Sequence, residues 1–213
     1  MMTTDSPRTR GEGFPRRDAG LHTFLDLTEG VRRYGVAVSV ERMDVETPGR
    51  FDGPTITVNS SHQPAEQCYH LAHALGSIVA WSVDRPGAMH VFDELRTAKR
   101  ARPRDHRRFE EALAGFARFE ETASRYAVWF LNEAGHAELI EPYTMFFRAD
   151  LEAMRIFHRE GKAPVWPQFF AAWKRSVASG TITVKPYSPS PIPAFVPARI
   201  PAQEVVQEHD GEA

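Results

Sequence analysis

The residues best suited to chemistry lie in one short segment, where His70, His73 and Ser77 follow one another at helical spacing. A helix of the pattern H-E-x-x-H binds zinc through two histidines four residues apart, and the glutamate beside the first takes a proton from zinc-bound water. His73 fills the first histidine position here, but Ala74 stands where the glutamate belongs and Ser77 where the second histidine belongs. The segment therefore lacks the base and one ligand that this hydrolytic chemistry requires.

A helical wheel at 100° per residue divides this segment into two faces. The apolar stripe contains Cys68, Leu71, Ala72, Leu75, Ile78 and Val79, and the opposite face contains His70, His73, Ala74, Ser77 and Trp81. We predict that the second face borders a binding cleft, with Ser77 and Trp81 in its lining. The alternative interpretation is a partly exposed face whose histidines form only local hydrogen bonds.

A carboxylate in a second helix favours the interpretation as a site. The spacing predicts a helix over residues 105–133, and Glu120 lies in the middle of its apolar face. An ionised carboxylate buried without a partner costs several kcal/mol, so Glu120 requires a cation or hydrogen-bond donors. We predict that it faces His70 and His73, with or without a metal ion between them. The alternatives are an ion pair with Arg125 or Arg148, or a position at the surface.

The hydrophobic pattern along the chain indicates an α+β fold that is mostly helical. A helix is expected from Leu21, ended by Gly35. Strands are expected at 36–40 and 55–58, paired as a hairpin or small antiparallel sheet near the N-terminus. The further helices are predicted near 64–83, 89–101, 105–133, 138–160 and 167–179.

Composition divides the chain into a central domain and two tails. Residues 1–20 are polar and rich in arginine, and predict a disordered N-terminal tail. Residues 21–185 are expected to form a single domain. Residues 186–213 begin with closely spaced prolines and predict an extended C-terminal tail, which either lies along the domain surface or is loose.

The overall composition is that of an ordinary soluble globular protein. The 213 residues are 42% hydrophobic and 25% charged, with a net charge of −2. This charge gives no indication of direct nucleic-acid binding, and no apolar run reaches the ~18–20 residues that span a membrane. Cys68 is the single cysteine, which excludes a disulfide framework. The absence of a secretory signal favours a cytoplasmic location.

Three segments together resemble the ImmA/IrrE-like metallopeptidases, over roughly residues 20–135. They are the strand region Gly53–Asn59, the helical stretch Cys68–Gly76 and the later stretch Glu120–Ala127. The resemblance implies a zincin-like domain in which His73 matches the first zinc ligand and Glu120 the third. The family carries out limited proteolysis, often of helix-turn-helix repressors.

The substitutions at Ala74 and Ser77 change what this resemblance implies about function. We expect a catalytically inactive pseudo-metallopeptidase that acts as a protein-binding or regulatory module, without a cofactor. A helix-turn-helix regulator is the partner that the resemblance implies. One alternative is a divergent zinc hydrolase that uses His70, His73 and Glu120 as ligands and a different base, such as Glu66. The other alternative is a non-catalytic helical scaffold protein.

Overall fold

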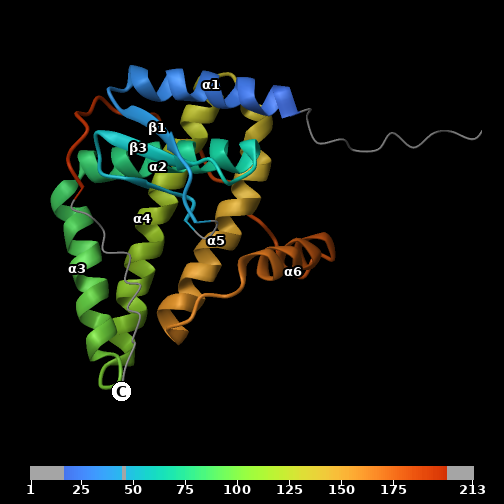
Figure 1. The fold of residues 1–213 in the computed structure, drawn as a ribbon. Coiled ribbons are helices and arrows are strands. Elements are labelled where there is room, and N and C mark those ends of the chain that lie inside the picture. The colour runs from blue at the N-terminus through green and yellow to red at the C-terminus, as the bar shows by residue number, and fades with distance from the viewer. Residues whose placement is uncertain (1–16, 45–46, 201–213) are drawn as a thin grey trace, which may run out of the picture.

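The computed structural model describes residues 17–44 and 47–200. It confirms an α+β fold that is mostly helical, with a small sheet near the N-terminus (Figure 1). The elements are, in order, α1 (Arg17–Arg33), β1 (Ala37–Glu41), β2 (Gly49–Phe51), β3 (Thr55–Asn59), α2 (Pro64–Val83), α3 (Arg85–Ala101), α4 (His106–Glu133), the short 3-10 helix η1 (Ala137–Leu139), α5 (Ile140–Glu160) and α6 (Trp166–Ala178).

The sheet is mixed, and its strand order is β1-β3-β2. Strand β3 pairs antiparallel with β2 but parallel with β1, in a register that places Ala37 opposite Thr55. The expected antiparallel pairing of the first strand with 55–58 is therefore wrong. The reason is the short strand β2, which the sequence pattern did not indicate. It reverses the chain, so β3 returns in the direction of β1 and lies between the other two strands.

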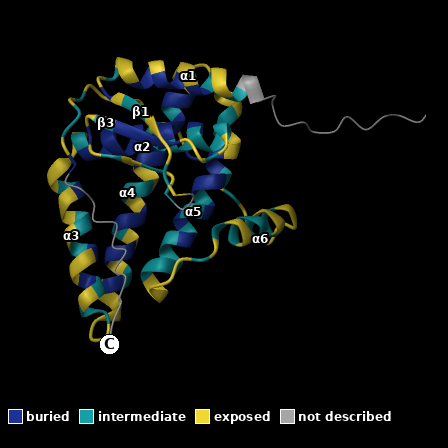
Figure 2. Ribbon diagram, viewed as in Figure 1, coloured by how far each residue is buried: buried dark blue, intermediate teal, exposed yellow. Residues whose placement is uncertain are grey.

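Helix α2 lies at the centre of the fold and is buried along most of its length (Figure 2). It packs against α4, α1 and β3. The crossing with α4 is very close at Gly76, where a Cβ atom would lie 2.1 Å from the carbonyl oxygen of Ala123. The absence of a side chain at residue 76 thus allows the two backbones to touch and sets the spacing of the side chains that follow along both helices.

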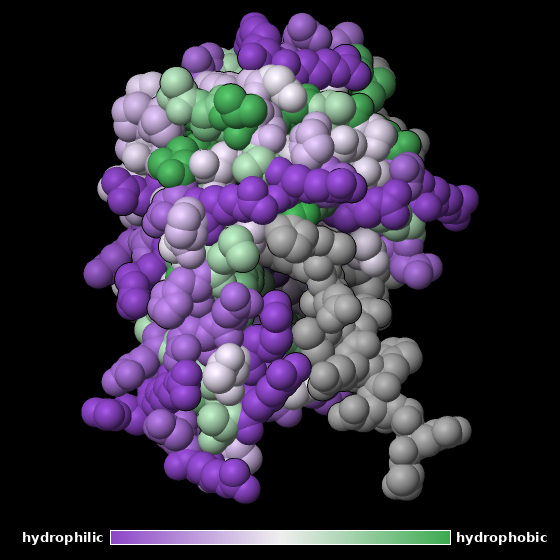
Figure 3. All heavy atoms as spheres, turned by 90° about the vertical axis from the view of Figure 1, so that its left-hand side faces the viewer, coloured by the Kyte–Doolittle hydropathy of each residue, from purple (hydrophilic) through white to green (hydrophobic). Residues whose placement is uncertain are grey.

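The far ends of α3 and α4 form a second, smaller core of six residues: Leu95, Ala98, Phe109, Ala112, Leu113 and Phe116. On the side of the molecule where α3 lies, the surface is mostly hydrophilic, and hydrophobic groups appear as small separate areas (Figure 3). Helix α6 has no buried residue. Among the described helices, none combines the length and apolar character needed to cross a bilayer.

Two helices begin earlier than the sequence pattern predicts. Helix α1 starts at Arg17 rather than Leu21, and α3 starts at Arg85 because the Asp84 carboxylate accepts a hydrogen bond from the Gly87 N–H and caps the first turn. The part of the predicted tail over residues 1–16 lies outside the described residues. At the other end, residues 186–200 are extended and lie along the domain.

Candidate functional site

The centre of the candidate site is His73, whose two ring nitrogens have partners on two other helices. Its Nε2 atom lies 3.1 Å from Oε2 of Glu120 on α4, and its Nδ1 atom lies 3.0 Å from the hydroxyl of Tyr143 on α5. The side chains of His73 and Glu120 are each only 14% exposed. The prediction that Glu120 faces the histidine helix is confirmed. The site thus joins α2, α4 and α5 through hydrogen bonds of a single imidazole.

Packing fixes the orientation of this imidazole ring. The Phe147 ring stacks on His73 with a centroid distance of 3.9 Å and an angle of 13° between the planes. Tyr143 and Phe147 are four residues apart on α5 and so lie on the same face of that helix. One turn along α2 from His73, the backbone contact of Gly76 with Ala123 holds α2 against α4. The local sequence therefore fixes both the ring and the separation of the helices that carry its partners.

Burial controls the protonation of the groups around the imidazole. It raises the pKa of Tyr143 well above its ordinary value, so the phenol keeps its proton beside Nδ1 of His73. The other ring nitrogen, Nε2, faces the Glu120 carboxylate, which accepts the hydrogen bond whenever Nε2 carries a proton. Loss of hydration also raises the pKa of Asp150 from 3.8 to about 6, with His73 lowering it and Glu120 raising it. Asp150 keeps some exposed surface, yet the protein atoms around its carboxylate leave it poorly hydrated.

His70 lies in a different environment from His73. Its ring packs edge-on against His62, Phe146 and Phe147, at centroid distances of 5.6, 5.3 and 5.9 Å. The pKa of His70 is lowered to about 3. Burial is the main cause, and the neighbouring imidazoles of His62 and His73 contribute to the same lowering. His70 is therefore a neutral side chain of the aromatic core, and the structure gives it no contact with Glu120.

The other residues singled out on α2 are buried, contrary to the expectation of an open cleft along this face. Ala74 is 6% exposed, and Ser77 and Trp81 are each 4% exposed. The Ser77 hydroxyl donates a hydrogen bond to the carbonyl oxygen of His73 in its own helix, at 3.1 Å. The helical-wheel prediction of a face bordering a cleft was wrong because α2 is enclosed on several sides, so its less apolar face is also covered. Glu66, the alternative base, lies 3.2 Å from Nδ1 of His62.

The donor set does not fit the zinc site that the family resemblance implies. Nε2 of His73 and Oε2 of Glu120 are close enough to bind the same metal ion, but a catalytic zinc ion normally has three protein ligands. Over residues 17–44 and 47–200, no group of three or more His, Cys, Asp or Glu side chains is arranged to hold a metal ion. His70 faces the aromatic core and Ser77 bonds within α2, so neither supplies the third donor.

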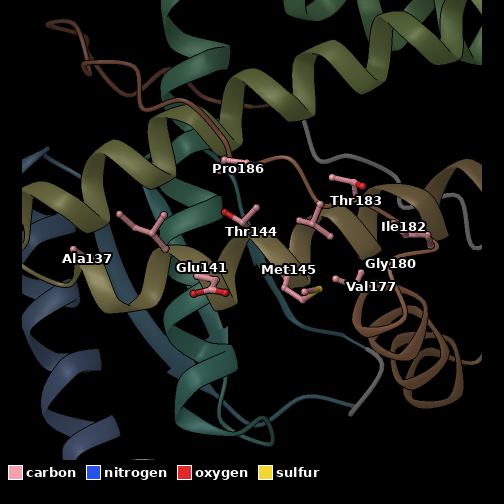
Figure 4. Close-up of a pocket in the computed structure, with 11 residues that line it drawn as sticks. Ala137, Glu141, Thr144, Met145, Val177, Gly180, Ile182, Thr183 and Pro186 are labelled. Carbon is pink, nitrogen blue, oxygen red and sulfur yellow. The ribbon is translucent and has the colours of Figure 1, made fainter.

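A pocket of about 700 Å³ opens on another face of α5, between that helix and residues 180–186 (Figure 4). Its lining is mostly apolar, with Ile140, Thr144 and Met145 from α5 and Val184 from the segment after α6. Glu141 is the one charged side chain in this lining. The pocket contains neither His73 nor Glu120, so it is separate from the hydrogen-bonded site.

Sequence reasoning missed Tyr143 and Asp150, both of which lie on α5 beside the imidazole. A usable signal was present, because Tyr143, Phe147 and Asp150 occur at i, i+4 and i+7 and so share one helical face. A tyrosine and an aspartate on an otherwise apolar face indicate polar partners across the core. Which helix supplies those partners depends on tertiary packing, and the pattern of α5 alone does not contain that information.

Comparison of the chain with protein-family models, with curated protein sequences and with solved structures gave no match.

Proposed function

We propose that this protein is a non-catalytic relative of the ImmA/IrrE-like metallopeptidases and acts in the cytoplasm as a protein-binding or regulatory module. The family relationship rests on the three sequence segments described above and on the position of Glu120 opposite His73. A helix-turn-helix regulator is the class of partner that this relationship suggests. In this proposal the polar centre connects three helices and does not hydrolyse a peptide bond.

The observation that carries the proposal is the way in which His73 is satisfied. Tyr143 and Glu120 occupy both of its ring nitrogens, and Ala74 supplies no base at the position where the H-E-x-x-H helix carries its glutamate. Buried polar groups that bond to one another in this way stabilise one specific packing of a core. The metallopeptidase mechanism instead needs a glutamate beside the first zinc histidine to take a proton from the metal-bound water, and residue 74 is an alanine.

A divergent zinc hydrolase is the second candidate, and one distance favours it. Nε2 of His73 and a carboxylate oxygen of Glu120 lie 3.1 Å apart, a separation that two ligands of one zinc ion can have. This candidate requires a third ligand from His70, whose ring would have to leave its contacts with Phe146 and Phe147.

Metal analysis separates these two candidates. We expect protein purified without a histidine tag to contain zinc far below one equivalent between pH 6 and 8, and the His73→Ala variant to contain the same amount. The His90→Ala variant is the matched control because His90 is an exposed histidine on α3. One equivalent of zinc that is lost in His73→Ala but kept in His90→Ala would contradict the metal-free centre proposed here and favour the hydrolase candidate.

The Glu120→Gln variant gives a second measurement. Without a metal, its side-chain carbonyl can still accept the hydrogen bond from Nε2, so we expect the melting temperature to change little. A chelator should leave the melting curves of both proteins unchanged. A chelator-induced fall in the melting temperature of the wild type that is absent in Glu120→Gln would contradict the proposal.

A further inference from the structure

The segment after α6 crosses the domain as an extended strand-like chain without regular secondary structure (Figure 1, orange to red). We call residues 184–200 the strap. It contains five prolines, at positions 186, 189, 191, 193 and 197. Proline restricts the backbone to extended conformations, so such a segment loses little conformational entropy when it binds. The strap is therefore suited to lie on a surface as a preformed ligand would.

The domain forms hydrogen bonds to the main chain of the strap at several points. Arg148 and Arg125 donate hydrogen bonds from their Nε atoms to the carbonyl oxygens of Lys185 and Ser188, each at 3.1 Å. The Ser190 N–H donates to the carbonyl oxygen of Arg125 at 3.2 Å. Contacts of this kind recognise an extended backbone whatever its side chains are.

The far end of the strap is held in the same way. The Ala198 N–H donates to the Ser82 hydroxyl at 3.0 Å, and the Ile200 N–H donates to the carbonyl oxygen of Asp52 at 2.8 Å. Gly53, with φ of 104°, lets the strap approach closely, because a Cβ atom there would lie 1.9 Å from the carbonyl oxygen of Ala198. Elements from β2 to α5 thus contribute to one continuous binding face.

The strap side chains join the main core at separate points, where Ile192, Phe195 and Ala198 pack against it partly buried. Tyr187 and Ile200 are 4% and 3% exposed, whereas Val196 is 83% exposed. Two residues of α5 contact the Tyr187 ring. The Arg148 guanidinium lies 4.0 Å from the ring centre, and the centre of the Tyr143 ring lies 6.2 Å from it. Backbone hydrogen bonds combined with isolated side-chain anchors are the pattern by which proteins bind extended peptides.

The strap is also connected to the domain by a weakly held segment. Helix α6 has no buried residue, and Ser179, Gly180 and Thr181 are exposed. Gly180 has open space around its Cα atom. Segments with few buried contacts open locally at a small free-energy cost, so this connection can open or be cut without disturbing the helical core.

We propose that the face beneath the strap is a binding site for an extended, proline-rich peptide of a partner protein, and that the strap is its intramolecular occupant. The partner peptide places an aromatic residue over Tyr143, where Tyr187 now lies. Because Tyr143 bonds to His73, exchange of the strap uncovers the polar centre described above. This inference rests on the proposed function, for which it specifies the chemistry of the partner.

The test uses the whole chain with a specific protease recognition sequence inserted between Gly180 and Thr181. Cleavage there converts the strap into a separate, non-covalently held peptide. The probe is a fluorescent synthetic peptide of residues 182–200, and its binding is followed by fluorescence anisotropy. We expect the cleaved protein to take up the probe and the uncleaved protein to bind it at least 100-fold more weakly, because a tethered occupant competes at an effective concentration in the millimolar range.

Variant probes identify the contacts that carry the binding. A probe with Tyr187→Ala should bind at least tenfold more weakly, and one with Val196→Ala should bind like the wild type. In the protein, Arg148→Ala should weaken binding, whereas Arg118→Ala should not, because Arg118 is an exposed arginine of α4 away from the strap contacts. Equal binding of all probes would overturn the proposal.

Hydrogen exchange on the uncleaved chain provides a measurement that does not depend on the insertion. The amides of Ser190, Ala198 and Ile200 should exchange at least 100-fold faster than core amides of α2. Exchange of strap and core amides at one common rate would show that the strap is an integral part of the core, as would loss of the helical circular dichroism when the cleaved strap is removed by gel filtration. A dimer of the uncleaved chain formed by exchanged straps would assign the face to a second copy and would also overturn the proposal.

The two proposals fail in different ways. Zinc that depends on His73 would contradict the non-catalytic function and leave the exchange result unaffected. Failure of the probe to exchange would contradict the peptide-binding face and leave the metal analysis unaffected.

Discussion

Among single residues, Asp150 gives the clearest prediction, because burial raises its pKa from 3.8 to about 6. The folded protein holds this proton more tightly than the unfolded chain, so the stability is complete below pH 4 and falls as the pH rises from 4 to 6. The Asp150→Asn variant removes the ionised form. At pH 7.5 we expect its free energy of unfolding, from urea titration, to exceed that of the wild type by about 1–2 kcal/mol.

The comparison needs a second pH and a control variant. At pH 4 the gain of Asp150→Asn should disappear, since the wild-type carboxyl is then neutral. Asp93→Asn on α3 removes an exposed carboxylate whose ion pair with Arg96 is weak, so it should change the stability by less than about 1 kcal/mol at either pH. A destabilised Asp150→Asn protein at pH 7.5 would show that the carboxylate has a stabilising partner.

The sequence allowed Glu120 to be assigned to the site but not Tyr143 or Asp150. Glu120 was detectable because an ionised group on an apolar helix face needs a partner, and His70 and His73 were suitable side chains on another predicted helix. The same logic applies to Asp150, but its cost is reduced by protonation instead of by an ion pair. Such a group leaves no matching cation elsewhere in the sequence to indicate where it lies.

At the scale of helices, the close crossing of α2 and α4 gives a prediction for Gly76. A Cβ atom at residue 76 would overlap the carbonyl oxygen of Ala123, which is backbone and cannot move aside. Gly76→Ala should therefore separate the two helices and lower the free energy of unfolding by about 1–3 kcal/mol or more. It should also lengthen the His73–Glu120 contact, which the chemical shifts of the His73 ring nitrogens report.

Gly115 on α4 is the matched control for this substitution. Its added Cβ would meet only the end of the Arg118 side chain, at 3.7 Å. Gly115→Ala should raise the stability by about 0.5–1 kcal/mol, because alanine favours the helix and restricts the unfolded chain. Equal effects of the two substitutions in urea titrations would show that the crossing is not sterically tight at Gly76.

The helices were easier to predict than their surroundings. The predicted range 64–83 coincides with α2, and Gly161 ends α5 in a left-handed conformation, as expected. The prediction that one face of α2 borders a cleft was wrong, because periodicity describes a single helix and not the number of neighbours that enclose it. Strand β2 was missed because three residues are too few for an alternating pattern, and with it the direction of β3 was wrong.

For the whole molecule, stability against acid combines two poorly hydrated groups with opposite effects. Asp150 stabilises the folded state as the pH falls from 6 to 4, whereas His70 destabilises it. The pKa of His70 is lowered from 6.5 to about 3 in the folded protein, so only the unfolded chain takes up this proton in between. The contribution of His70 is therefore complete above pH 6.5 and is lost as the pH falls towards 3.

The His70→Phe variant removes this titration while keeping an aromatic ring among Phe146 and Phe147. Between pH 7 and pH 5 the wild type should lose about 2 kcal/mol through His70, from 1.5 pH units at 1.36 kcal/mol each, and His70→Phe should lose correspondingly less. The difference between the two pH values is compared for each protein, so any packing cost of the larger ring cancels. His90→Gln, at an exposed position of α3, should follow the wild-type profile. If His70→Phe and the wild type lose equal stability between pH 7 and 5 in urea titrations, then the folded protein protonates His70, and its ring must leave the aromatic core to do so.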